Sequence, residues 1–192
     1  MVPDARAYRS YADLARAQTR GRDYRIVVER RPASPVAVIA PHGGGIENGT
    51  SELARAIAAS DFSLYLFEGL RRSRNYTALH LTSRCFDEPQ CLGLIAACPF
   101  VVAIHGCAGL EPGVLLGGLD AELCGALGAA IDAAGVSAQT SGHRFPAVHP
   151  NNVCNRGARG RGVQLEVTES LRASDTRALV DAVRSVLLPL QS

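Results

Sequence analysis

Two histidines and a glutamate are spaced in this chain in a way that suits a metal centre. His42 and Glu47 flank three glycines in P-H-G-G-G-I-E (41–47), and His105 ends the apolar run F-V-V-A-I-H (100–105). Two histidine nitrogens and one glutamate oxygen form a known ligand set for catalytic zinc, which keeps one position open for water. We therefore predict that these three side chains hold a zinc ion.

Other interpretations of the same residues stay open. Residues 41–47 could instead form a glycine-rich loop that binds an anion at a helix N-terminus. A single histidine such as His105 can be a hydrogen-bonded structural residue. His80, in A-L-H-L-T-S, is the alternative third ligand, and His143 and His149 are weaker candidates.

A second carboxylate could act as a base beside the metal. Glu166 lies in the predicted strand 163–168 and shares its face with Gln164, because side chains alternate along a strand. A carboxylate next to a zinc-bound water can take its proton and deliver it to a leaving amine. We predict that Glu166 is this general base; the alternative is a salt-bridged glutamate of an edge strand.

The segment before that strand is rich in arginine and asparagine, from residue 151 to residue 162. The planar guanidinium of arginine fits a carboxylate with two hydrogen bonds. We expect Arg156, with Asn155 beside it, to hold a substrate carboxylate. Arg159 or Arg161 would hold a second carboxylate or stabilise an oxyanion. The alternative is a solvated basic loop.

The elements that must position these residues alternate between buried strands and helices. This order predicts an α/β domain with an open, mixed, mostly parallel sheet flanked by helices, whose ligands gather beyond the carboxyl ends of the strands. The segment 62–68, followed closely by 77–82, is expected to form an antiparallel pair. We expect strands at 23–30, 35–40, 62–68, 77–82, 100–105, 113–117, 136–140 and 163–168, and helices at 10–20, 50–59, 88–98, 120–134 and 174–187.

Bulk properties narrow the class of protein. The length of 192 residues favours one domain, 1–192, and a net charge of +2 gives no argument for nucleic-acid binding. No apolar stretch reaches the length of a membrane span, and residues 1–20 lack the apolar core of a secretory signal. The six cysteines show no paired spacing and are expected to be buried or free thiols, although their even number leaves disulfides open.

Ordered matches along almost the whole chain resemble the phage and bacterial poly-γ-glutamate hydrolases, which are zinc-dependent γ-glutamyl hydrolases. The matching motifs are D-Y-R-I (23–26), A-P-H-G-G-G-I-E-N-G-T-S-E-L-A (40–54), L-Y-L-F-E-G (64–69), L-H-L-T-S-R-C-F-D-E-P (79–89), I-H-G (104–106), N-N-V-C-N-R (151–156) and G-V-Q-L-E (162–166).

The resemblance implies a single-domain fold related to the zinc carboxypeptidases. It also implies one Zn²⁺ ion and hydrolysis of γ-glutamyl amide bonds, in poly-γ-glutamate or in smaller γ-glutamyl and N-acyl amino acid substrates. It places His42, Glu47 and His105 on the metal and Glu166 at the base position. Carboxypeptidases use H-x-x-E, whereas four residues separate His42 from Glu47 here, so the loop geometry must differ.

The expected partner is an anionic peptide or polymer, with no nucleic acid and no membrane. The expected location is the cytoplasm, or outside the cell after lysis if the protein derives from a phage. Asn155 and Arg156 resemble the Asn-Arg pair that holds a terminal carboxylate in carboxypeptidases, although here the pair follows the last zinc histidine.

The same residues are compatible with two other functions. A non-catalytic module could bind anionic peptides through Arg156, Arg159 and Arg161 without turnover. A phosphate-binding protein could use the loop at 43–45, although this loop lacks the Lys-Ser/Thr ending of a P-loop.

Overall fold

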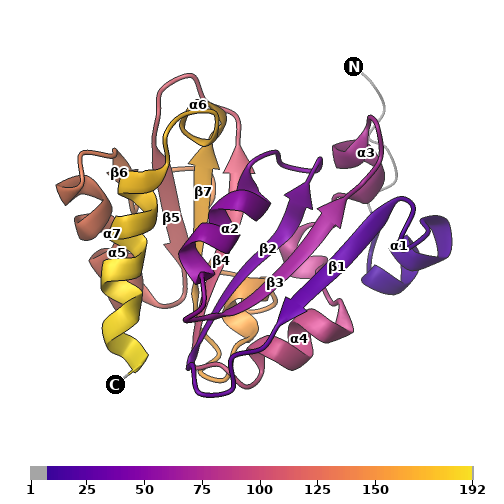
Figure 1. The fold of residues 1–192 in the computed structure, drawn as a ribbon, viewed down its shortest axis with the longest axis horizontal. Coiled ribbons are helices and arrows are strands. Elements are labelled where there is room, and N and C mark those ends of the chain that lie inside the picture. Colours follow the sequence, from indigo (N-terminus) through magenta and orange to yellow (C-terminus); the bar gives the residue numbers. More distant parts are fainter. Residues whose placement is uncertain (1–7, 192) are drawn as a thin grey trace.

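The computed structural model describes residues 8–191, which form one α/β domain around a seven-stranded sheet (Figure 1). Residues 1–7 and 192, at the two ends of the predicted domain 1–192, lie outside the described residues. Residues 1–7 also belong to the segment 1–20, which is expected to lack the apolar core of a secretory signal. The strands are β1 (Tyr24–Glu29), β2 (Val36–Gly44), β3 (Ser63–Gly69), β4 (Phe100–Cys107), β5 (Val114–Gly118), β6 (Ala138–Gln139) and β7 (Val163–Thr168).

The sheet is mixed and mostly parallel, as predicted. Its strand order is β1-β3-β2-β4-β7-β5-β6, and within residues 8–191 the antiparallel pairs are β1 with β3 and β5 with β7. The carboxyl ends of β2, β4 and β7 therefore meet at one edge, which is the upper edge in Figure 1. This is the edge at which open α/β sheets bind ligands.

The predicted strand at 77–82, and its antiparallel pairing with 62–68, are wrong. Residues Asn75–Leu79 form the short helix α3, and the antiparallel neighbour of β3 is β1. Leu79 and Leu81 are both buried in the same core cluster, so the apolar side chains alternate without a strand. Alternation over so few residues cannot distinguish a strand from a helix end that continues in extended backbone.

Helices cover both faces of the sheet (Figure 1). The helices α2, α5 and α7 pack on one face, while α1 and α4 pack on the other. Their bounds are α1 Tyr11–Ala17, α2 Thr50–Ala58, α4 Pro89–Ile95, α5 Ala121–Ala133, α6 Glu169–Arg172 and α7 Arg177–Leu187, and 3₁₀ turns occupy Ser83–Cys85, Val153–Arg156 and Leu188–Gln191.

The two faces of β7 differ in chemistry, as its alternation predicts. Val163, Leu165 and Val167 are fully buried in the cluster beneath α2, α5 and α7. Each such side chain contributes about 1.5–3 kcal/mol through burial, which fixes the register of the strand. Gln164 and Glu166 consequently project from the opposite face, where they are also buried.

Two further features of the described residues concern the cysteines and the length of the helices. The six cysteines are free thiols, and five of them are buried. Between residues 8 and 191, no helix combines the length and the apolar composition that crossing a bilayer would require.

Candidate active site

A β-bulge places His42 at the site. Along β2, Ala37 and Ile39 face one side of the sheet and Val38 and Ala40 the other, and the pairing with β3 then shifts register between Ala40 and Gly43. A bulge re-aims the side chains that follow it. His42 consequently lies against residues of the face that carries Ile39, rather than beneath α2.

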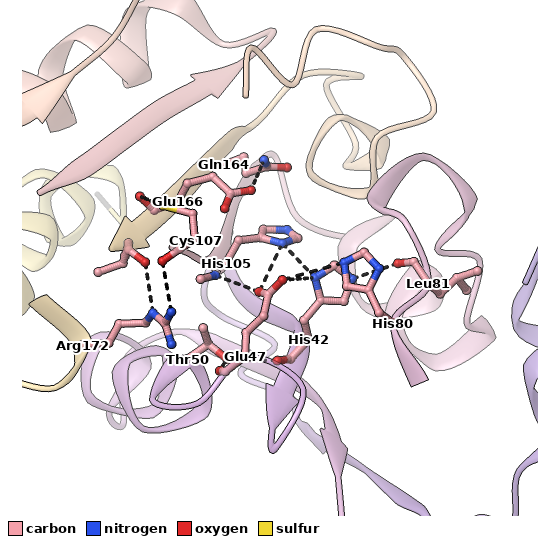
Figure 2. Close-up of polar contacts among 12 residues, drawn as sticks. His42, Glu47, Thr50, His80, Leu81, His105, Cys107, Gln164, Glu166 and Arg172 are labelled. Carbon is pink, nitrogen blue, oxygen red and sulfur yellow. Dashed lines mark hydrogen bonds and ion pairs between the residues drawn. The ribbon is translucent and has the colours of Figure 1, made fainter. Parts of the chain in front are cut away.

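The three predicted metal ligands converge at the carboxyl edge of the sheet (Figure 2). His42 Nδ1 lies 3.1 Å from Glu47 Oε1 and 3.1 Å from His105 Nδ1. His105 Nδ1 lies 3.8 Å from Glu47 Oε2, and that oxygen also accepts a 2.7 Å hydrogen bond from the Gly106 amide. Two imidazole nitrogens and a carboxylate therefore face one another at this edge of the sheet.

The hydrogen bonds of His42 show that this cluster fits a cation. Its Nε2 lies 2.8 Å from the Leu81 carbonyl, which can only accept, so Nε2 carries a proton. In a neutral imidazole Nδ1 then has a lone pair, directed at the Glu47 carboxylate and at His105 Nδ1. Such a carbonyl contact typically orients a metal-binding histidine. The donor set of two imidazoles and one carboxylate suits zinc.

His80 is a second candidate for the third ligand. It caps α3, and its ring stacks on that of His42 with centroids 4.1 Å apart. His80 Nε2 lies 3.8 Å from Glu47 Oε1, and ligand atoms of His42, Glu47 and His80 all lie within 4.8 Å of one another. Both candidate sets therefore share His42 and Glu47 and differ in one histidine.

The protonation of these groups reflects burial and their mutual charges. Burial disfavours the charged forms of His80 and His105 and, with His42 nearby, lowers the pKa of each to about 3. Burial also opposes protonation of His42, but the Glu47 carboxylate outweighs it and leaves the His42 pKa raised. Although burial opposes its ionisation, Glu47 has its pKa lowered to about 2, chiefly by His42. The site therefore holds a carboxylate that favours a neighbouring cation.

Glu166 lies beside this cluster. His105 and Glu166 are paired across the parallel strands β4 and β7, and both side chains line the same cavity of about 890 Å³. Burial and the Glu47 carboxylate raise the pKa of Glu166 to about 7. A carboxyl group with this pKa can both accept and release a proton near neutral pH.

The predicted carboxylate-binding residues do not reach the cavity. Asn155 is buried, and its Oδ1 accepts from the amides of Leu119 and Gly162 while its Nδ2 donates to the carbonyls of Ala147 and His149. All four hydrogen-bonding positions of the amide are thus used inside the protein.

The three predicted arginines face other partners. Arg156 donates to the Phe86 carbonyl at 3.4 Å. Arg159 and Arg161 lie 3.1 Å and 3.7 Å from the buried carboxylate of Asp120, as ion pairs. None of the three is among the residues that line the 890 Å³ cavity.

Two other arginines do line it. Arg84 belongs to the 3₁₀ turn Ser83–Cys85, and Arg144 belongs to the loop that follows β6. Both are exposed, and Arg144 lies over the ring of its neighbour Phe145. Neither arginine stands out in the sequence, because nothing in the order of residues shows which loops meet over the sheet.

The glycine loop is used by the protein itself. The Gly44 amide donates to Ser51 Oγ at 2.9 Å, and the Gly45 amide donates to the Gly69 carbonyl at 3.1 Å. Gly44 has a φ of +60°, a conformation that favours glycine. Because these amides already have partners, the loop does not present them to a phosphate.

Arg172 connects the segments that carry the site. Its guanidinium donates to the carbonyls of Asn48, Cys107 and Val167, two of which appear in Figure 2. These carbonyls lie one or two residues beyond Glu47, His105 and Glu166 in the sequence. The Arg172 guanidinium thereby links the ends of β4 and β7 to the loop that follows β2.

Most of the chain is similar in sequence to known proteins. Residues 8–179 match the family described as poly-gamma-glutamate hydrolase. The chain is 41% identical over 147 residues to the SPbeta prophage-derived UPF0714 protein YoqZ of Bacillus subtilis (strain 168), covering 76% of this chain and 52% of that protein. It is 39% identical over 150 residues to the UPF0714 protein YndL of the same organism, covering 77% and 59%. The matched region thus spans little more than half the length of these relatives.

Solved structures show the same fold. A structure of a bacteriophage poly-gamma-glutamate hydrolase superposes with a TM-score of 0.89 at 32% identity, covering 95% of this chain and 97% of that one. A structure of YndL described as apo and zinc-free superposes with a TM-score of 0.84 at 31% identity, covering 96% of both chains. At 12% identity and a TM-score of 0.50, an N-formylglutamate amidohydrolase from Ralstonia eutropha JMP134 is similar in fold alone, covering 88% of this chain and 95% of that one.

Proposed function

Because the chain belongs to the poly-gamma-glutamate hydrolase family, we propose that it is a zinc-dependent hydrolase of γ-glutamyl amide bonds. One observation carries the proposal. Two imidazoles and a carboxylate meet within 3.1–3.8 Å, beside a buried glutamate, at the floor of a cavity large enough for a peptide segment. The substrates are poly-γ-glutamate or smaller γ-glutamyl and N-acyl amino acids.

His42, Glu47 and His105 would hold the metal. We prefer His105 to His80 because His105 is fixed on a central strand next to Glu166, whereas His80 follows a short helix. A bound zinc ion would polarise the scissile carbonyl and lower the pKa of a water molecule. The backbone of Gly106 and the carbonyl of Leu81 orient Glu47 and His42 for this role.

Glu166 would move the proton. As a carboxylate it removes a proton from the attacking water, and as the acid it returns that proton to the nitrogen of the leaving amine. Its burial near the Glu47 carboxylate and its pKa of about 7 suit both halves of this transfer. The face of β7 that carries Glu166 is the face that lines the cavity.

Arg84 and Arg144 would bind the carboxylates of the substrate. A γ-linked glutamate chain carries one free carboxylate per residue, so the groups that bind it must lie along the cavity. These two arginines come from different loops of its wall. We assign them this role in place of Asn155, Arg156, Arg159 and Arg161, whose side chains have partners elsewhere.

The proposal is tested by product analysis. Purified protein is incubated with poly-γ-glutamate and with a panel of γ-glutamyl peptides, after zinc loading, after chelation and after restoring zinc, and the products are identified by mass spectrometry. We expect chelator-sensitive cleavage of γ-amide bonds and one zinc ion per chain. Binding without cleavage under every condition would instead support the anionic-peptide module, and cleavage that persists without metal would refute the zinc dependence.

A further inference from the structure

Three buried polar side chains form a directed chain of hydrogen bonds that ends on Glu166. Gln164 Nε2 donates to Glu166 Oε1 at 2.8 Å, and Asn152 Nδ2 donates to Gln164 Oε1 at 3.0 Å. Asn152 Oδ1 in turn accepts from the backbone amide of Cys154 at 3.2 Å. Figure 2 shows the last step, with the amide of Gln164 facing the carboxylate of Glu166.

The direction of this chain is fixed by the backbone. An amide N–H can only donate, so the Cys154 N–H requires the oxygen of Asn152 to face it. The NH₂ group of Asn152 then faces Gln164, which must present its oxygen to Asn152 and its NH₂ group to Glu166. One backbone amide in the turn Val153–Arg156 thereby sets the orientation of two side-chain amides.

These groups lie where such an orientation affects chemistry. Asn152, Gln164 and Glu166 are all buried and all line the 890 Å³ cavity. A buried donor to one carboxylate oxygen holds the carboxylate in one orientation. With Oε1 held by Gln164, the other oxygen of Glu166 is left to exchange the proton.

We propose that Asn152 and Gln164 are positioning residues that hold the Glu166 carboxylate in the orientation needed for proton transfer. This inference rests on the proposed function, in which Glu166 is the base. It gives a role to the N-N-V-C-N-R segment that differs from substrate binding, because Asn152 acts through Gln164 rather than on the substrate.

The first test removes the donor to Glu166. Gln164→Met keeps the length of the side chain but cannot donate, and we expect kcat on a γ-glutamyl peptide to fall about 10- to 100-fold. We expect KM to stay within about 2-fold of wild type, since ground-state binding is untouched. Zinc content should not change.

The second test reverses the polarity at Asn152. Asn152→Asp has nearly the same shape but no donor, so the NH₂ group of Gln164 is drawn toward the new carboxylate and away from Glu166. We expect the same fall in kcat. Asn151→Asp is the matched control, since the neighbouring residue is exposed and receives the same change of charge; its kcat should equal that of the wild type.

The double variant decides whether the residues act in series. If Asn152 acts only through Gln164, Gln164→Met with Asn152→Asp should be no slower than Gln164→Met alone. An unchanged kcat in both single variants, or two falls that multiply, would overturn the proposal. Glu166→Gln distinguishes a failure of this inference from a failure of the proposed function. If Glu166→Gln is inactive while the Gln164 and Asn152 variants have normal kcat, only this inference fails. If Glu166→Gln keeps near-wild-type rates, the proposed function itself fails.

Discussion

Two buried polar clusters of this protein differ in how completely their atoms are paired. Around Asn155, every hydrogen-bonding position of the amide has a partner within the chain. Around His42, two imidazole nitrogens face each other across 3.1 Å, and His105 Nε2 is buried without a hydrogen-bond partner among the described residues. Buried polar groups are normally paired, so the incomplete pairing around His42 is consistent with the ligand site that the proposed function requires.

The arginines show the same contrast. Arg159 and Arg161 lie against the buried carboxylate of Asp120, whereas Arg84 and Arg144 lie on the walls of the cavity. A guanidinium that already faces an internal carboxylate stabilises the fold, and one that faces a cavity can receive a carboxylate from outside. Under the proposed function, the first pair has a structural role and the second pair binds substrate, and each of the following variants tests that assignment.

The largest effect is expected at the proposed base. Glu166→Gln keeps the size of the side chain and its contact with Gln164 but cannot accept a proton, so turnover should fall by about 10²- to 10⁴-fold. Zinc content, measured by elemental analysis, should match that of the wild type. Loss of zinc together with activity would instead place Glu166 among the metal ligands.

The choice of third ligand comes next. His105→Ala should weaken zinc affinity by more than about 100-fold, because a direct ligand contributes more than the groups that orient it. His80→Ala serves as the comparison and should weaken affinity less. Competition with a fluorescent zinc chelator measures both. The reverse ranking would assign the third position to His80, which has the same distance from the Glu47 carboxylate.

Asn155→Ala tests the fully paired cluster. It leaves the amides of Leu119 and Gly162 without their acceptor, and we expect the free energy of unfolding to fall by about 2–4 kcal/mol. Denaturant titration measures this change. The activity of the protein that remains folded should be nearly normal. A stable variant with a greatly raised KM would restore the predicted substrate-binding role of Asn155.

The smallest effect is expected from the arginines. Arg84→Gln and Arg144→Gln should each raise KM for γ-glutamyl peptides about 2- to 10-fold, since exposed charge pairs are weak. The effect should shrink at high salt and with peptides whose carboxylates are amidated. Arg161→Gln is the matched control and should leave KM unchanged. An equal rise in that control would return the binding role to the 155–161 segment.

The sequence by itself was sufficient for the fold class, the central strands and the candidates at the sheet edge, but not for the segment 77–82. Buried parallel strands appear as continuous apolar runs, so 35–40, 100–105 and 163–168 were recognisable, and polar residues at their ends were conspicuous. The alternation along 163–168 also predicts that Gln164 and Glu166 share one face of the strand, opposite the apolar residues.

Only the tertiary structure decided which polar residues meet. The β2 bulge that turns His42 toward His105 depends on pairing with β3, and the loops that bring Arg84 and Arg144 to one cavity are far apart in the chain. Asn155 and Asn152 lie three residues apart in one short segment, yet one holds backbone groups and the other faces Gln164. Residue type defines what a side chain can donate or accept, but its partner depends on distances that arise when the chain folds.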